Sequence, residues 1–183
     1  KITVIHHGVD PRFNINLATK KNNGSEKEKY LLYVGLIKQH KNVGILIKSF
    51  LRLKKRTGFE NLKLRLVGKS DMKQKIVREW IYEINRNDDI LLEPQVDEQR
   101  LIDLYHNAAV LVFPSLYEGF GFPLLEAMAS RIPIVASRAA SIPEILGEGA
   151  GLYFDPHSAP ELEQCLLKIL QSSYLASRLI EDG

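Results

Sequence analysis

The chain has 183 residues, 45% of them hydrophobic and 26% charged, which is typical of one soluble globular domain. Its net charge of +3 is too small to indicate a nucleic-acid partner. Its only cysteine, Cys165, excludes an intrachain disulfide bond and lies among apolar residues, so we expect it in the core. No apolar run approaches the roughly 20 residues of a membrane-spanning helix.

Short apolar runs alternate with amphipathic stretches along the chain. The predicted strands span residues 2–6, 30–35, 62–68, 89–93, 108–114, 132–137 and 151–154. Residues 8–28 are polar and predict a loop. Between the strands, apolar residues recur with helical spacing, and the predicted helix starts are Asn42, Ser70, Asp97, Pro123, Ser141 and Ser158.

Other residues predict how these helices begin and end. Gly58 is expected to follow the first helix as its C-terminal glycine. Ser141 with Glu144, and Ser158 with Glu161, have the spacing of capping boxes. The last helix is expected to bury Leu162, Cys165, Leu166, Ile169 and Leu170.

Most of the predicted strands are continuous apolar runs, and amphipathic helices separate them. This order predicts an α/β domain with a doubly wound, mostly parallel, Rossmann-like sheet that helices cover on both faces. Ligands of such sheets bind at the carboxyl ends of the strands. The loops of interest therefore follow Val34, Val67, Leu92, Phe113 and Ala136.

The loop after residue 114 combines turn-forming residues with two carboxylates. Gly119 and Gly121 allow close approach of a ligand to the backbone, and Pro123 suits the start of a helix. Amide groups at such a helix start bind anions, while Glu118 and Glu126 can accept hydrogen bonds from hydroxyl groups. A tight turn with solvated glutamates is the alternative, but the complete set favours a phosphorylated, hydroxyl-rich ligand such as a nucleotide sugar.

At this point four segments resemble a known family. FPSLYEGFGFPLLEAMA (113–129) is similar to the signature of retaining GT-B glycosyltransferases, in which seven residues separate two glutamates. HHGVDPRF (6–13) resembles their interdomain segment, and segments 33–50 and 134–156 resemble neighbouring parts of their donor domain. The resemblance implies a carboxyl-terminal, donor-binding domain. Residues 1–28 would be the interdomain segment and a loop, residues 29–183 the Rossmann-like core, and the amino-terminal acceptor domain would be absent.

The resemblance also implies roles for individual residues. Glu118 would lie against the donor sugar, Glu126 would accept from the ribose hydroxyls, and Lys41 would neutralise the diphosphate. Lys41 and Glu118 would thus be the catalytic residues. The loop 94–96 would meet the base through backbone groups. The remaining expected donor contacts are Gly35, Lys38, Val96, Phe120, Gly121, Phe122 and Leu125.

The chain departs from the family pattern at three positions. Leu36 stands where many relatives have a diphosphate-binding arginine. Lys38 could replace that arginine or could be an ordinary solvated lysine. Pro94 stands in place of a glycine, which would alter contacts with the base, and His7 replaces the asparagine of the interdomain segment.

Neither a metal nor a cofactor is implied beyond the nucleoside diphosphate sugar, which is the donor substrate. Asp88 and Asp89 lead into a strand and favour a turn, while His6 and His7 lack a suitably spaced third ligand. Trp80 and Tyr117 are interpreted as packing residues rather than stacking platforms.

The expected reaction is metal-independent transfer of a sugar such as mannose or glucose, with retention, to a hydroxyl acceptor in polysaccharide or lipopolysaccharide synthesis. The acceptor glycan or lipid-linked sugar would bind through the missing domain. A cytoplasmic location is expected, with contact at the inner face of the membrane left open. A sugar-nucleotide epimerase of GT-B fold and a non-catalytic nucleotide-sugar-binding module are the alternatives.

Overall fold

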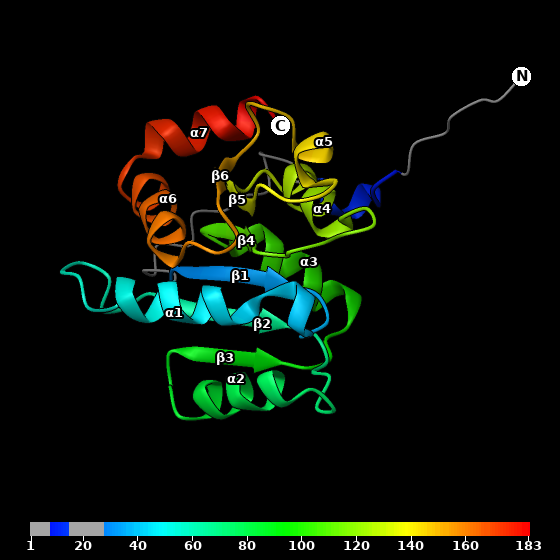
Figure 1. The fold of residues 1–183 in the computed structure, drawn as a ribbon. Coiled ribbons are helices and arrows are strands. Elements are labelled where there is room, and N and C mark those ends of the chain that lie inside the picture. Colours follow the sequence, from blue (N-terminus) through cyan, green and yellow to red (C-terminus); the bar gives the residue numbers. More distant parts are fainter. Residues whose placement is uncertain (1–7, 15–27) are drawn as a thin grey trace, which may run out of the picture.

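The structure is a computed structural model that describes residues 8–14 and 28–183 (Figure 1). Its sheet has the strand order β3-β2-β1-β4-β5-β6, and all neighbouring strands run parallel. The strands are β1 Tyr30–Val34, β2 Lys63–Val67, β3 Ile90–Glu93, β4 Val110–Phe113, β5 Ile134–Ser137 and β6 Leu152–Phe154. The doubly wound, Rossmann-like fold is confirmed. The strand predicted at residues 2–6 lies outside the described residues.

Seven α-helices and two 3-10 helices accompany the sheet in the described part of the chain. They are η1 Pro11–Phe13, η3 Gln39–Lys41, α1 Val43–Leu53, α2 Lys75–Asn85, α3 Glu98–Asn107, α4 Phe122–Ala129, α5 Ile142–Leu146, α6 Ala159–Gln171 and α7 Ser173–Glu181. The loop expected over residues 8–28 therefore contains η1. The single last helix of the prediction is two helices, because Ser172 ends α6 and caps α7 by accepting a hydrogen bond from the Leu175 amide.

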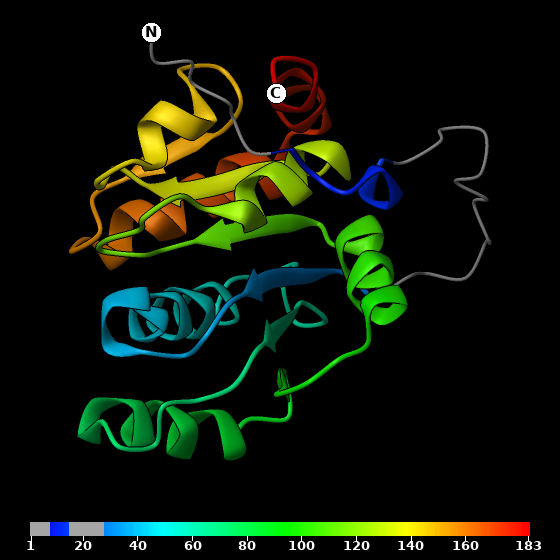
Figure 2. The same ribbon diagram turned by 90° about the vertical axis from the view of Figure 1, so that its right-hand side faces the viewer.

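The apolar core lies in two layers, one on each face of the sheet. Side chains of α1, α2, α6 and α7 form one layer, and Cys165 is buried in it as expected. Side chains of η1, α3, α4 and α5 form the other layer. In Figure 2, α1 of the first layer lies to the left of β1, and α3 of the second layer lies to its right.

The helix starts agree only partly with the predictions. Asp97 caps α3, with its carboxylate 2.7 Å from the Arg100 amide. Ser158 caps α6 by accepting from the Glu161 amide, but Glu161 accepts from the Asp155 amide rather than completing a capping box. Pro123 lies in the first turn of α4, as expected.

Asn42 and Ser141 directly precede α1 and α5 as predicted, although neither side chain caps its helix, whereas the predictions for Gly58 and Ser70 are wrong. Asn42 precedes α1 in a left-handed conformation, and its side chain makes no capping bond. Helix α1 ends at Leu53, well before Gly58. Helix α2 begins at Lys75, because Ser70 instead forms an isolated β-bridge beside β1. Ser141 precedes α5 without capping it.

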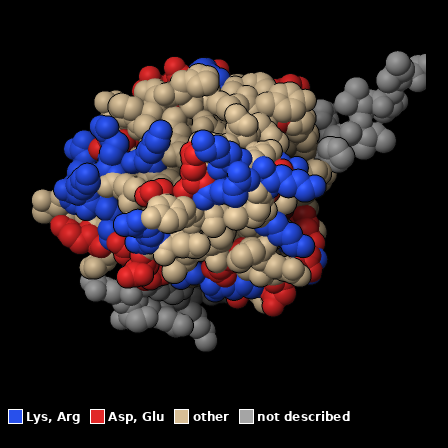
Figure 3. Space-filling model, turned by 60° about the horizontal axis from the view of Figure 1, so that its bottom comes forward, with Lys and Arg blue, Asp and Glu red and all other residues tan. Residues whose placement is uncertain are grey.

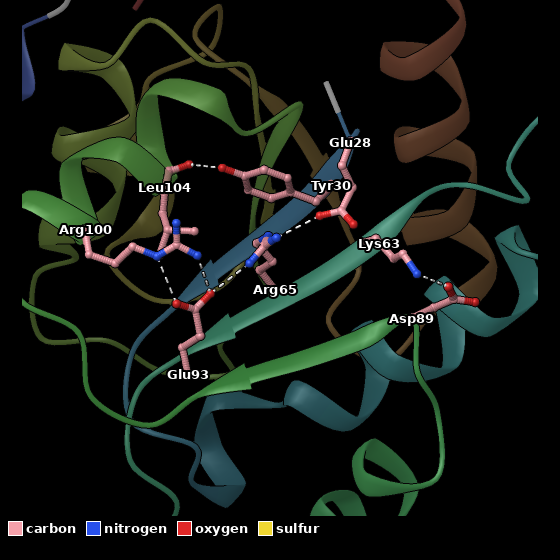
Figure 4. A network of polar contacts seen from close by, with 8 residues as sticks. All are labelled: Glu28, Tyr30, Lys63, Arg65, Asp89, Glu93, Arg100 and Leu104. Carbon is pink, nitrogen blue, oxygen red and sulfur yellow. Dashed lines mark hydrogen bonds and ion pairs between the residues drawn. The ribbon is translucent and has the colours of Figure 1, made fainter. Parts of the chain in front are cut away.

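Among the described residues, polar side chains line much of the face of β2 and β3 that lies opposite α1 and α2. Lys63, Arg65 and Glu93 remain partly exposed on the face opposite α1 and α2. Figure 4 shows Arg65 between the carboxylates of Glu28 and Glu93, and Glu93 in turn faces Arg100 of α3. The N···O distances of these contacts are 2.7–3.1 Å. Ion pairs rather than apolar packing therefore line this part of the sheet.

The surface away from the carboxyl ends of the strands has two hollows. One, of about 720 Å³, lies beside α1 and α2 and is lined by residues that include Lys48 and Trp80. The other, of about 890 Å³, lies at the amino ends of β2 and β3 and includes Asp89. In Figure 3, Lys and Arg side chains are interspersed with Asp and Glu. Within the described ranges, every helix is too short or too polar to cross a membrane.

Candidate donor site at the switch point of the sheet

The direction in which the chain adds strands to the sheet reverses between β1 and β4. The chain goes outward from β1 to β2 and β3, and then returns to the other side of β1 to form β4, β5 and β6. Loops that leave β1 and β4 therefore part in opposite directions and open a crevice at their carboxyl ends. The two carboxyl-end loops of interest are residues 35–42 and 114–121.

An ion pair joins these two loops. Lys41, the last residue of η3, places Nζ 2.6 Å and 2.7 Å from the two carboxylate oxygens of Glu118. The side chains are only 19% and 10% exposed, so water screens the pair much less than it would screen a surface ion pair. The two residues predicted to be catalytic are thus brought together, although they are far apart in the sequence.

Three serines hold Glu118 in place. The buried Ser115 hydroxyl donates to Glu118 Oε1 at 2.6 Å, and Ser141 Oγ donates to the Glu118 carbonyl at 3.1 Å. Ser137, at the end of β5, donates to the Ser115 carbonyl at 2.5 Å. Hydroxyl groups from the loop after β4 and from the residue before α5 therefore fix the carboxylate and the backbone of Glu118, and Ser137 of β5 supports Ser115.

Asn42 explains why the chain enters α1 in a left-handed conformation. Its side-chain amide donates to the Pro114 carbonyl at 3.2 Å and to the Pro156 carbonyl at 2.8 Å. The backbone adds a further link, because the Leu116 amide donates to the His40 carbonyl. Asn42 thus connects the loops after β1, β4 and β6, and its side-chain amide is used there rather than in a capping bond to α1.

Helix α4 starts directly after the Glu118 loop. Gly121 has φ +121°, which L side chains rarely adopt, so this turn requires glycine. A Cβ at Gly119 would meet nothing within 4 Å, so the backbone there is open to approach. The Leu124 amide is not one of the free amides at this helix start, because it donates to the Gly121 carbonyl at 2.9 Å. The α4 dipole still makes the start of this helix favourable for an anion.

Aromatic side chains flank this helix start. The Phe120 and Phe122 rings lie 5.2 Å apart at 60°, and Phe122 is exposed. Tyr117 is 64% exposed, so its interpretation as a packing residue is wrong. Leu125 is partly buried in the first turn of α4.

Glu126 lies one turn further along α4, on the side that faces α3. The Tyr105 hydroxyl donates to Glu126 Oε2 at 2.6 Å. Burial raises the pKa of Glu126, and the hydrogen bond from Tyr105 opposes that rise by stabilising the ionised form. Burial and the neighbouring carboxylate also raise the pKa of Tyr105 well above its usual value, so Tyr105 remains a donor.

The other predicted contacts lie around the same edge. Gly35 directly follows β1, and a Cβ on its neighbour Gly68 would meet the Gly35 carbonyl oxygen at 2.1 Å. The Lys38 side chain is partly buried and takes part in no ion pair with the described residues. Val96 packs at the margin of the core layer that contains α3 and α4, while Leu36 is exposed.

The metal-ligand candidates that the structure describes do not form a site. Within residues 8–14 and 28–183, no three His, Cys, Asp or Glu residues are grouped so that they could hold a metal ion. Asp88 and Asp89 lie in the turn before β3, and Asp89 pairs with Lys54 and Lys63. His6 and His7 lie outside the described residues.

A comparison with protein families decides what this architecture belongs to. The family model described as "Glycosyl transferases group 1" matches residues 15–183. The chain belongs to this family. The match covers both loops of the switch point and the whole described sheet.

Curated relatives of this group 1 chain include two named O-antigen chain mannosyltransferases. The one from Escherichia coli, O-antigen chain mannosyltransferase B, is 33% identical over 142 residues, which are 78% of this chain and 37% of that protein. RfbU from Salmonella typhimurium is 32% identical over 97% of this chain and 47% of that protein. The chain therefore spans less than half the length of these relatives.

Solved structures of similar fold include whole glycosyltransferases and one separate domain. A glycosyltransferase from Rickettsia africae has a TM-score of 0.78 at 20% identity, over 99% of this chain and 50% of that chain. The C-terminal domain of a group 1 glycosyl transferase from Francisella tularensis has a TM-score of 0.71 at 23% identity, over 85% of this chain and 82% of that chain. These likenesses show the fold.

Several residues that shape this group 1 site were not found from the sequence. Ser115 and Ser137 carry no motif of their own, Ser141 has only the spacing of a capping box, and Tyr105 has the pattern of an ordinary core residue of an amphipathic helix. The one available signal was position, because Ser115 and Ser137 stand at the carboxyl ends of predicted strands. Their hydrogen-bond partners depend on which loops the topology brings together.

Proposed function

We propose that the chain is the donor-binding part of a retaining, metal-independent glycosyltransferase that uses a nucleoside diphosphate sugar. The observation that carries the proposal is the Lys41–Glu118 ion pair, which spans the switch point beside the start of α4. A cation and a helix start favour the diphosphate, and a fixed carboxylate favours sugar hydroxyl groups. Membership of the group 1 family supports the same reading.

In the proposed reaction, the bond between the anomeric carbon and the diphosphate breaks while an acceptor hydroxyl attacks from the same face. The acceptor proton passes to the departing phosphate oxygen, so this part of the protein need not supply a base. Negative charge grows on the diphosphate as it leaves. Lys41 and the start of α4 would stabilise that charge without reorganising, which is commonly a large term in catalysis. Glu118 would orient the sugar.

The names of the relatives guide the choice of substrates. Two are named O-antigen chain mannosyltransferases, which favours mannose as the sugar and a cell-envelope polysaccharide as the acceptor. The acceptor would bind through a part of the protein that these residues do not include. We place the reaction in the cytoplasm, at or near the inner face of the membrane.

Titration calorimetry of the full-length protein with GDP, UDP and ADP tests the donor site. We expect one of them to bind, and we expect Lys41→Met to weaken that binding. Lys48→Met removes an exposed lysine of α1 far from the switch point and is the matched control. Unchanged affinity in Lys41→Met would contradict the role of Lys41.

Product analysis tests the reaction. Incubation with GDP-mannose and an acceptor, followed by NMR of the products, distinguishes transfer, epimerisation and absence of reaction. The configuration at the anomeric carbon shows whether it is retained, and activity in excess EDTA tests metal independence. An epimerised donor without transfer would establish the alternative enzyme class.

A further inference from the structure

The short helix η1 packs against the helices that carry Tyr105 and Glu126. The Phe13 ring meets the Tyr105 ring edge-on, with centroids 5.4 Å apart and planes at 88°. Phe13 and Tyr105 are 5% and 0% exposed, so neither ring can turn without displacing its neighbours. Tyr105 in turn donates to Glu126. Phe13, Tyr105 and Glu126 thus form a continuous contact from η1 to the predicted ribose-binding carboxylate.

Polar contacts fix η1 in this place. The Phe13 carbonyl lies 3.0 Å from His106 Nε2 on α3 and 3.3 Å from Ser130 Oγ at the end of α4. The Arg12 guanidinium reaches Glu98 in the first turn of α3, with Nη1 2.6 Å from Oε2. Asp10 accepts from the Arg12 amide and caps η1. Helix η1 is therefore attached to both α3 and α4.

The hydrogen bond from the Tyr105 hydroxyl fixes the orientation of the Glu126 carboxylate. A carboxylate accepts through both oxygens, and Tyr105 occupies Oε2. Oε1 accepts no hydrogen bond from the residues that the structure describes, so it is the oxygen left for a ligand hydroxyl. Without Tyr105, the side chain could rotate and the ionised form would be less favourable in this half-buried place.

We propose that Tyr105 is a positioning residue for Glu126, and that Phe13 holds Tyr105 in place, so that recognition of the donor ribose depends on how η1 packs against α3. The inference rests on the proposed function, in which Glu126 accepts from the ribose hydroxyls. Because η1 belongs to the segment that resembles an interdomain connection, the same contacts link that connection to the donor site.

The test compares a nucleoside diphosphate with its 2′,3′-dideoxy analogue. Calorimetry on the full-length protein gives the ratio of the two dissociation constants, which reports only the interactions with the ribose hydroxyls. For a hydrogen bond to a carboxylate we expect a ratio of about 10 or more in the unaltered protein. Tyr105→Phe, which keeps the ring and removes the hydroxyl, should reduce the ratio to roughly 2, and Phe13→Leu should give an intermediate value.

Tyr30→Phe is the matched control. Tyr30 is also buried, and its hydroxyl donates at 2.7 Å to the Leu104 carbonyl of the same helix, so this change removes an equivalent bond without touching Glu126 (Figure 4). Its ratio should equal that of the unaltered protein. In a Glu126→Gln background, Tyr105→Phe should not change the ratio further, because Tyr105 acts through Glu126.

The outcomes separate this inference from the proposed function. If the unaltered protein binds no nucleoside diphosphate, both are wrong. If it binds and prefers the ribonucleotide, but Tyr105→Phe keeps the preference, the donor site stands and Tyr105 has no positioning role. A fall of equal size in Tyr30→Phe would show a general effect on α3 and would also overturn the inference. An unchanged ratio in Phe13→Leu would show that the packing of η1 does not affect recognition of the ribose.

Discussion

The ion pair between Lys41 and Glu118 allows a test on both stability and binding. Lys41→Met removes the charge and keeps most of the apolar length of the side chain. It leaves the Glu118 carboxylate, which is 10% exposed, with only the Ser115 hydroxyl as a side-chain donor among the described residues. Glu118→Gln removes the other charge and keeps an oxygen that can still accept from Ser115.

The burial of the pair sets the size of the effect. Exposed ion pairs contribute about 0.2–1 kcal/mol, whereas removing one partner of a fully buried pair costs about 3–5 kcal/mol. With exposures of 19% and 10%, Lys41→Met should cost about 2 kcal/mol of unfolding free energy. For a chain of this size that corresponds to a fall in Tm of roughly 4–8 °C. Glu118→Gln should cost less, about 1 kcal/mol, because an unpaired lysine can extend into solvent.

Urea unfolding of the two single variants and the double variant measures the coupling. We expect the double variant to lose less stability than the sum of the single variants, by about 1–2 kcal/mol. In calorimetry, Lys41→Met should also weaken nucleoside diphosphate binding about 10- to 100-fold, which is the range for a lost charge-assisted hydrogen bond. Additive stability changes, together with unaltered nucleotide affinity, would refute both the coupling and the proposed role of Lys41.

Three further predictions concern the carboxylates and their support. Because burial raises the pKa of Glu126, its ionisation opposes folding as the pH rises above about 4.3. Glu126→Gln should therefore increase the unfolding free energy over that of the unaltered protein by more at pH 7 than at pH 4. Urea unfolding measures this, and a loss of stability in the variant at pH 7 would count against it. Burial acts to raise the pKa of Glu93, but hydrogen bonds from two arginines outweigh it and lower the pKa. Glu93→Gln should therefore reduce the unfolding free energy by roughly 1 kcal/mol at pH 7, and this loss should disappear as the pH falls below about 4. Acid titrations of the stability of both proteins check this. Ser115→Ala should weaken nucleotide-sugar binding several-fold, because it releases the Glu118 carboxylate. Ser49→Ala removes an equally buried hydroxyl elsewhere and should leave binding unchanged. Equal binding by both variants would contradict the role of Ser115.

Hydrophobic pattern was sufficient to predict the strands and the class of fold. Each strand in the described residues lies within its predicted range, because continuous apolar runs separated by amphipathic stretches leave few alternatives. The polar face of β2 was missed although the sequence indicated it. Lys63 and Arg65 alternate with leucines there, which is the pattern of a strand with one buried face.

Helix ends were predicted less well because a polar residue can bond to more than one partner. Asn42 and Ser141 have the residue types of helix caps, yet their side chains bond to backbone carbonyls in neighbouring loops. Those carbonyls come from segments far away in the sequence, so local pattern could not reveal them. Asp97 and Ser158 have no such competing partner and cap their helices as predicted.

The two glutamates of the motif have different surroundings, which give identical side chains different properties. Glu118 has a cation beside it, whereas Glu126 has a neutral phenol and a raised pKa. This division matters for a donor that carries a diphosphate. Two like charges 4 Å apart repel by about 4 kcal/mol at an effective dielectric constant of 20, so a bare Glu118 would oppose the ligand it is meant to orient. In the proposed donor site, Lys41 would cancel that charge, while Tyr105 would let Glu126 accept from the ribose, further from the phosphates. On that proposal, a carboxylate at Glu118 would be compatible with a diphosphate only while Lys41 is present.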